Sequence, residues 1–100
     1  MSKLDNIKKL SKLGEQAQKQ MSAFGAFSEA AFTEGAISIK NKELIALAVG
    51  LTTQCDYCLD IHKKKAIAAG ATEQEIAETA FVAAALRAGA AVTHATQLID

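Results

Sequence analysis

The chain has 100 residues, which is the size of one domain, and half of them are apolar although only 5 are aromatic. Lys and Arg together number 11, as do Asp and Glu, so the chain is formally neutral and lacks the basic footprint of a nucleic-acid-binding protein. Proline is absent, which argues against collagen, proline-rich linkers and sandwiches with many tight turns.

The sequence predicts two helices in the first third of the chain. Apolar residues recur at intervals of three and four along residues 3–20, which is the spacing of one helix face, and Ser2 or Asp5 could cap the start of this helix. A second helix is predicted over residues 23–33, where three of the phenylalanines lie, and Gly35 is expected to end it.

Two further helices are predicted in the middle of the chain. Ser38 is expected to cap the third, whose nearly continuous apolar run at residues 44–49 predicts a helix that is buried all round and lies at the centre of the fold. The fourth helix is expected to start near Cys55 and to end at Gly70, a residue type that commonly follows the last helical turn.

The last part of the chain is predicted to be helical as well. Thr72 and Glu75 have the spacing of a capping box, which opens a fifth helix that runs through Ala84. Gly89 could kink or break this helix before a final segment over residues 92–99. No period-two stretch predicts a strand, so we expect an all-α fold of about six short helices in a single domain.

The predicted organisation is an N-terminal helix, residues 1–22, and a helical domain over residues 23–100 that forms one compact unit. Alanine supplies 21 positions, so the core buries little area per residue. A monomer of this size buries only about two-thirds of the surface that its unfolded chain exposes. We therefore expect the core to be completed by association into a homo-oligomer.

The sequence also suggests a cellular compartment. Its N-terminus lacks the apolar segment of a signal peptide, and its uninterrupted apolar stretches are far shorter than the ~20 residues of a membrane span. We therefore expect a soluble, cytoplasmic protein without a membrane partner, in which the two cysteines are reduced at rest. The short basic runs Lys8–Lys9 and Lys63–Lys65 are expected to be solvated helix faces.

The residues that carry chemistry are Cys55, Cys58, His62 and Glu43. Two cysteines three positions apart at a helix start lie one turn apart, within the ~4.4–6.8 Å Cα separation that a disulfide requires, and the helix N-terminus favours the thiolate. His62 lies four positions after Cys58, so it could accept the thiol proton. Glu43, in a buried helix, needs a partner, and contact with His62 would orient the imidazole.

Other interpretations of the cysteine pair remain open. The cysteines could be small buried apolar residues, or they could bind zinc together with a histidine. A structural zinc site needs four ligands, and the only other histidine is His94, which we expect to be a surface or interface residue. Thioredoxin-like chemistry places this motif beside strands, and none is predicted here, so a redox motif would stand on a helical scaffold.

The order and spacing of these residues resemble the core motif of the alkylhydroperoxidase D-like (AhpD-like) proteins, which belong to the carboxymuconolactone decarboxylase superfamily. The motif is a glutamate, eleven intervening residues, Cys-x-x-Cys, three intervening residues and a histidine, here Glu43 to His62. The flanking runs Lys40–Val49 and Ala68–Ile76 match as well, and the resemblance covers about residues 24–95.

The resemblance implies an all-α fold of about six helices, thiol-dependent reduction of hydroperoxides, and assembly into trimers or hexamers. By position, Cys58 resembles the cysteine that attacks the peroxide and Cys55 the partner that closes the disulfide, while Glu43 and His62 resemble the proton relay. We expect no cofactor and no metal, and an external dithiol as reductant: a lipoyl protein, a thioredoxin-like protein or a small thiol. The decarboxylase branch lacks the cysteine pair, so lactone decarboxylation is not expected.

One position departs from the family pattern. The characterised alkylhydroperoxidase D enzymes have a second histidine directly before the attacking cysteine, where this chain has Tyr57. A phenol ionises only near pH ~10 and cannot act as a base near neutral pH, so the relay is expected to be shorter. Tyr57 and Asp56 are expected to shape the mouth of the site; alternatively, they are an interface aromatic and an exposed cap residue.

The sequence leaves the nucleophile and the reaction open to alternatives. In most Cys-x-x-Cys helices the first cysteine is the more exposed and acidic one, which would favour Cys55, whereas the position of His62 and the family pattern favour Cys58. We expect a peroxidase that uses a dithiol and disulfide cycle. The alternatives are a disulfide reductase or thiol–disulfide carrier, and a helical oligomer whose cysteines are structural or sense redox state.

Overall fold

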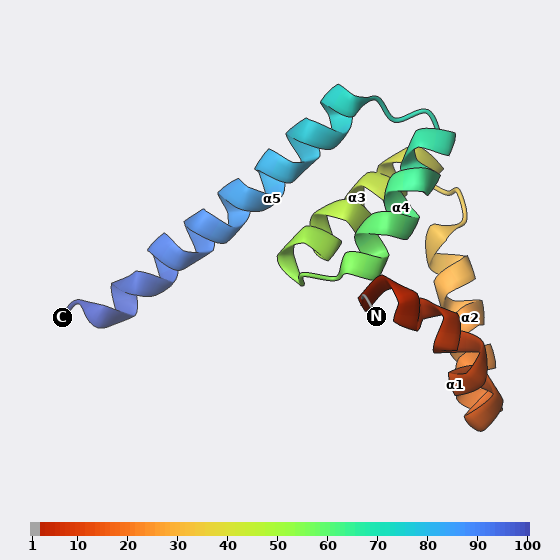
Figure 1. The fold of residues 1–100 in the computed structure, drawn as a ribbon. Helices are drawn as coiled ribbons and strands as arrows, with labels where there is room; N and C mark the ends of the chain where they lie inside the picture. The colour runs from red at the N-terminus through yellow and green to blue at the C-terminus, as the bar shows by residue number, and fades with distance from the viewer. Residues whose placement is uncertain (1–2) are drawn as a thin grey trace.

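Helices make up nearly all of residues 3–100, which are the residues that the computed structural model describes (Figure 1). Two short 3-10 helices flank five α-helices, and residues 3–100 contain no strand, so the predicted all-α fold is confirmed. In chain order the elements are η1 (Lys3–Lys9), α1 (Leu10–Gln16), α2 (Gln18–Phe32), α3 (Ile39–Thr52), α4 (Asp56–Ala68), α5 (Glu73–His94) and η2 (Ala95–Leu98).

The small core of the protein lies where α3 packs against α4 and the first half of α5. Leu47 of α3, Ala66 of α4 and Ala71 of the following loop are buried there, and three partly buried side chains pack against them: Leu44, Leu59 and Ile76. The predicted central position of α3 is confirmed. Its predicted burial on all sides is wrong, because Ile45 and Val49 are 51% and 54% exposed.

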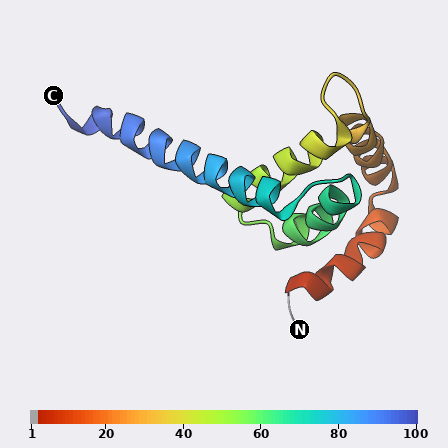
Figure 2. The same cartoon turned by 90° about the horizontal axis from the view of Figure 1, so that it is seen from above.

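The second half of α5 extends away from the rest of the chain (Figures 1 and 2). From Phe81 onward, α5 exposes large apolar side chains, each at least two-thirds accessible: Phe81, Val82, Leu86 and Val92. The radius of gyration is 16.7 Å, well above the ~13 Å typical of a compact chain of this length. The isolated chain therefore leaves much of its apolar surface in contact with water.

The prediction of one continuous helix over residues 3–20 is wrong. This segment is divided into η1 and α1, and the chain turns at Ala17 (φ −142°, ψ 64°) before α2 begins at Gln18, five residues earlier than predicted. Gly14 permits the turn, since a Cβ atom there would lie only 3.1 Å from Cγ of Met21 on α2. Asp5 lies within the first turn of η1 rather than at a cap, and Ser2 lies outside the described residues.

Three predicted helix boundaries, at Ser38, Gly70 and Thr72, are confirmed. The predicted end at Gly35 is wrong, because α2 already stops at Phe32 and Thr33 continues in an extended conformation (φ −68°, ψ 140°). The Ser38 hydroxyl accepts a hydrogen bond from the Asn41 N–H at 3.1 Å, and Gly70 has the left-handed φ of 98° after α4. Thr72 and Glu75 form the reciprocal capping box at the start of α5. The Lys40 ammonium, 2.8 Å from the Glu75 carboxylate, and the Thr72 N–H lower the pKa of Glu75.

Gly89 neither kinks nor breaks α5, which is continuous from Glu73 to His94. This predicted break is therefore wrong. A glycine inside a helix costs roughly 1 kcal/mol relative to alanine, and the neighbouring positions are mostly alanine, the strongest helix former. Favourable propensity on both sides keeps the helix intact.

Candidate redox-active site

A tight turn after α3 delivers the first cysteine to the start of α4. Gln54 adopts a left-handed conformation (φ 55°), and the Cys55 N–H donates to the Gly50 carbonyl at 2.9 Å. These two features reverse the chain within three residues after Thr52. Cys55 thereby becomes the N-cap of α4, as the predicted helix start near this residue requires.

The two cysteines are joined as a disulfide across the first turn of α4. Their Cα atoms are 5.2 Å apart, within the range predicted from a separation of three residues. The Cys58 N–H donates a hydrogen bond to Sγ of Cys55 at 3.2 Å. A helix N-terminus and a donated N–H both stabilise negative charge, so the Cys55 sulfur is in a favourable position for a thiolate after reduction.

Gly50 allows α4 to approach α3 closely at the second cysteine. A Cβ atom at this position would lie 3.3 Å from Cβ of Cys58 and 3.3 Å from Cδ2 of Leu59. A side chain here would push the first turn of α4 outward. The missing side chain of a buried glycine therefore helps to set where Cys58 lies.

Glu43 of α3 and His62 of α4 are in direct contact, as the sequence predicted. Oε2 of Glu43 lies 2.6 Å from Nδ1 of His62. Glu43 is almost fully buried, at 3% exposure, so it does not lie on a solvent-exposed face of α3. Because an ionised carboxylate can only accept, it favours the tautomer with the proton on Nδ1, which leaves Nε2 to exchange a proton with a third group.

Phe32, the last residue of α2, packs against the ring of His62. Its ring stacks on the His62 imidazole, with centroids 5.0 Å apart and planes inclined by 13°. The sequence predicts that Phe32 lies on a helix, but it does not predict that this residue lies at the site. No spacing rule could have found it, because the contact joins residues thirty positions apart on helices whose relative placement the sequence does not specify.

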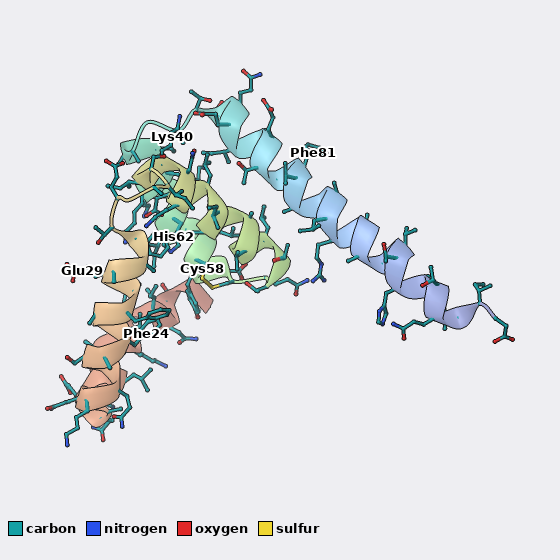
Figure 3. The ribbon with its side chains drawn as sticks, turned by 180° about the vertical axis from the view of Figure 1, so that it is seen from behind. Phe24, Glu29, Lys40, Cys58, His62 and Phe81 are labelled. Carbon is teal, nitrogen blue, oxygen red and sulfur yellow. A yellow bond between two sulfur atoms is a disulfide. The ribbon has the colours of Figure 1, made fainter. Side chains whose placement is uncertain are left out.

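Two open grooves meet at Phe32, Cys58 and His62, which line both of them. The first groove, of about 830 Å³, lies between η1, α1, α2 and α4, and Tyr57 is part of its wall. Asp56 is exposed and lines neither groove. Figure 3 shows Cys58 and His62 in the middle of the molecule beside α2, which carries Phe24 along the same groove.

The second groove, of about 590 Å³, lies between α2, α3 and α4. Its walls include Ile45 and Val49 on the exposed apolar face of α3, and Ile37 in the loop before this helix. A third groove, of about 920 Å³, reaches Glu43 but neither cysteine. Of the two cysteines, Cys58 lines both of the first two grooves and Cys55 lines neither.

His94, the second histidine of the chain, lines neither of the two grooves that Cys58 lines. His94 is exposed near the end of α5, where its Nδ1 is 3.2 Å from the side-chain amide of Gln97. Within residues 3–100, no three side chains of His, Cys, Asp or Glu are grouped so that they could hold a metal ion.

Comparison with known proteins places this site in a family context. The family model described as carboxymuconolactone decarboxylase family matches residues 18–100. An uncharacterized protein of the cox locus of Paracoccus denitrificans is 43% identical over an alignment of 90 residues, which covers 87% of this chain and 81% of the relative. An uncharacterized protein of Cupriavidus necator is 30% identical over 87 residues, 87% of this chain and 77% of the relative.

Two solved structures share the fold over most of their length. A protein from Methanobacterium thermoautotrophicum superposes with a TM-score of 0.81 at 37% identity, over 86% of this chain and 97% of its own. The apo form of a carboxymuconolactone decarboxylase family protein from Legionella pneumophila has a TM-score of 0.78 at 30% identity, over 92% of this chain and 82% of its own.

Proposed function

The chain belongs to the carboxymuconolactone decarboxylase family, and we propose that it is a thiol-dependent peroxidase that reduces hydroperoxides through a dithiol and disulfide cycle of Cys55 and Cys58. One observation supports this most strongly: the helix that begins with the cysteine pair also carries His62, whose Nδ1 is bound by the buried Glu43. A nucleophile, a base and a group that orients the base are thereby provided by two adjacent helices.

The first half of the proposed cycle oxidises Cys58. Nε2 of His62 takes the thiol proton, and the thiolate attacks the hydroperoxide, so that the O–O bond breaks and an S–O bond forms. The sulfur becomes a sulfenic acid and the peroxide is reduced to an alkoxide. The alkoxide takes the proton back from the imidazolium and leaves as an alcohol.

The second half closes and reopens the disulfide. The Cys55 thiolate attacks the sulfenic sulfur, the S–S bond forms, and the released hydroxide takes a proton to give water. The hydrogen bond from the Cys58 N–H to the Cys55 sulfur supports this role, because it stabilises the attacking thiolate. An external dithiol then reduces the disulfide in two exchange steps and is itself oxidised to a disulfide.

A thiol–disulfide carrier is the second candidate function. Two observations favour it: the Cys55 sulfur has the N-cap position of an acidic exchange cysteine, and Tyr57 stands where the resembled peroxidases have a second histidine. Such a protein would use the same sulfurs without consuming peroxide. A redox-sensing oligomer would turn over neither substrate.

A steady-state screen separates these functions. We expect the reduced protein to consume organic hydroperoxides with a dithiol reductant, tested with a lipoyl protein, a thioredoxin-like protein and a small dithiol. Turnover of disulfides in the absence of any peroxide activity would instead identify the carrier. Absence of both activities with all reductants would contradict the assignment as an enzyme of this chemistry.

We further propose that the protein is a homo-oligomer, a trimer or a hexamer, in which copies cover the exposed side of α5. Ala83 is buried in the chain and Ile76 packs against the core, so the start of α5 is part of the fold. By length and composition, residues Glu73–Leu98 could also cross a membrane, with 6% of the apolar window buried. A second copy fits better, because a span would take Arg87 and His94 into lipid.

We expect Leu86→Glu to dissociate the oligomer at micromolar concentration, because a carboxylate would replace an apolar side chain that a neighbouring copy covers. Sedimentation velocity without detergent measures this directly. Gln74→Glu adds the same charge to an exposed position of the same helix and should leave the oligomer intact. A wild-type monomer of 10.5 kDa, or a protein that sediments only with membranes, would contradict the proposal.

A further inference from the structure

The imidazole of His62 is held at two places by two different helices. Glu43 of α3 binds one edge of the ring through Nδ1 at 2.6 Å, and Phe32 of α2 covers one face at a centroid distance of 5.0 Å. A single hydrogen bond fixes one ring atom but leaves the ring able to rock about its bond to Cβ, because this torsion has broad wells. A ring stacked nearly parallel, at 13°, restricts that rocking.

The stacked pair of Phe32 and His62 lies in the same grooves as Cys58, the proposed nucleophile. Phe32, Cys58 and His62 line the same two grooves, so the three side chains are contiguous around the point where the grooves meet. The other two phenylalanines of α2 have no such role: Phe24 and Phe27 are 62% and 71% exposed. Phe32 is thus the aromatic residue of α2 that joins this helix to the proton relay.

The contact also has an electrostatic consequence. The face of a benzene ring carries partial negative charge and attracts a cation placed over it. His62 becomes a cation when it takes a proton from a thiol, so the stacked ring favours the state in which the imidazole is charged and the sulfur is a thiolate. Interactions of this kind change an equilibrium by roughly 3- to 30-fold when partly shielded from water.

We propose that Phe32 is a positioning residue for the thiol chemistry: it holds the plane of the His62 imidazole so that Nε2 stays available to Cys58, and it stabilises the imidazolium that forms. The inference rests on the proposed role of His62 as the base. It adds a positioning residue on α2 to the pair of Glu43 and His62, and it makes the packing of α2 against His62 a condition for a reactive Cys58 thiolate.

The test measures the thiolate of Cys58 without any peroxide. In a Cys55→Ser background, the rate of alkylation by iodoacetamide is followed from pH 5 to pH 10 in reduced protein. We expect Phe32→Leu to lower the rate at pH 7 by about 3- to 10-fold and to move the midpoint of the pH profile upward. Phe32→Tyr, which keeps an aromatic face, should restore the profile, and Phe27→Leu on the same helix should leave it unchanged.

A profile in Phe32→Leu that matches the unsubstituted background would overturn the proposal. A second measurement covers the case in which this variant does not fold: in the wild-type protein, NMR signals of the His62 ring protons should lie upfield of those of the exposed His94, because of the ring current of Phe32. Equal positions would show that the rings do not stack. Neither readout uses peroxide, so a failed peroxidase screen remains a separate result.

Discussion

Replacing Cys58 by serine is expected to abolish peroxide turnover, whereas Cys55→Ser is expected to allow one reaction per subunit. The two cysteines differ in what surrounds them: Cys58 shares both grooves with His62, while Cys55 accepts an N–H hydrogen bond at the N-cap. Without Cys58 no nucleophile lies beside the base. Without Cys55 the sulfenic acid on Cys58 has no partner to close the disulfide, so it should accumulate.

Mass spectrometry after one equivalent of hydroperoxide decides between these roles. The Cys55→Ser variant should gain one oxygen on Cys58, and the Cys58→Ser variant should remain unoxidised over the same time. The double variant is the control for oxidation elsewhere in the chain. The opposite pattern, with stable oxidation of Cys55 and an inert Cys58, would assign the nucleophile to the N-cap cysteine.

The parts of this molecule that the sequence predicts well depend on short spacings. The capping box at Thr72 and Glu75, the cap at Ser38 and the one-turn separation of the cysteines are all set by contacts within four residues. Helical geometry alone determines such contacts. The pairing of Glu43 with His62 was predictable for another reason, since a carboxylate in a buried helix needs a partner and few groups could provide one.

Features that depend on how helices are placed in space were not predictable. The turn at Ala17 allows Met21 to pack over Gly14, a contact between two helices that share one continuous apolar pattern in the sequence. The exposure of Ile45 on α3 was not predictable for a similar reason. A run of apolar residues predicts that a helix is buried, but it does not specify whether the covering surface belongs to the same chain or to another one.

The second large effect is expected at Glu43. An exposed carboxylate paired with a lysine would contribute about 0–1 kcal/mol, and its replacement would hardly be noticed. Glu43 is instead 3% exposed and lies 2.6 Å from His62, so its charge acts on the imidazole with little screening by water. Glutamine keeps the shape of the side chain and an oxygen that can accept from Nδ1, but it lacks the charge that stabilises the imidazolium.

We therefore expect Glu43→Gln to lower the rate of Cys58 alkylation at neutral pH by at least about tenfold, since general-base catalysis is typically worth ~10²–10⁴-fold and depends on the state of the base. The pH profile of the rate should move upward as well. Asp60→Asn is the matched control: it removes the same charge from α4, where Asp60 forms an exposed pair with Lys64 at 3.6 Å, and it should leave the profile unchanged. Equal profiles for wild type and Glu43→Gln would remove Glu43 from the relay. A shift of the same size in Asp60→Asn would show that any nearby negative charge is sufficient, whereas a shift confined to Glu43→Gln would assign the effect to direct contact with the imidazole.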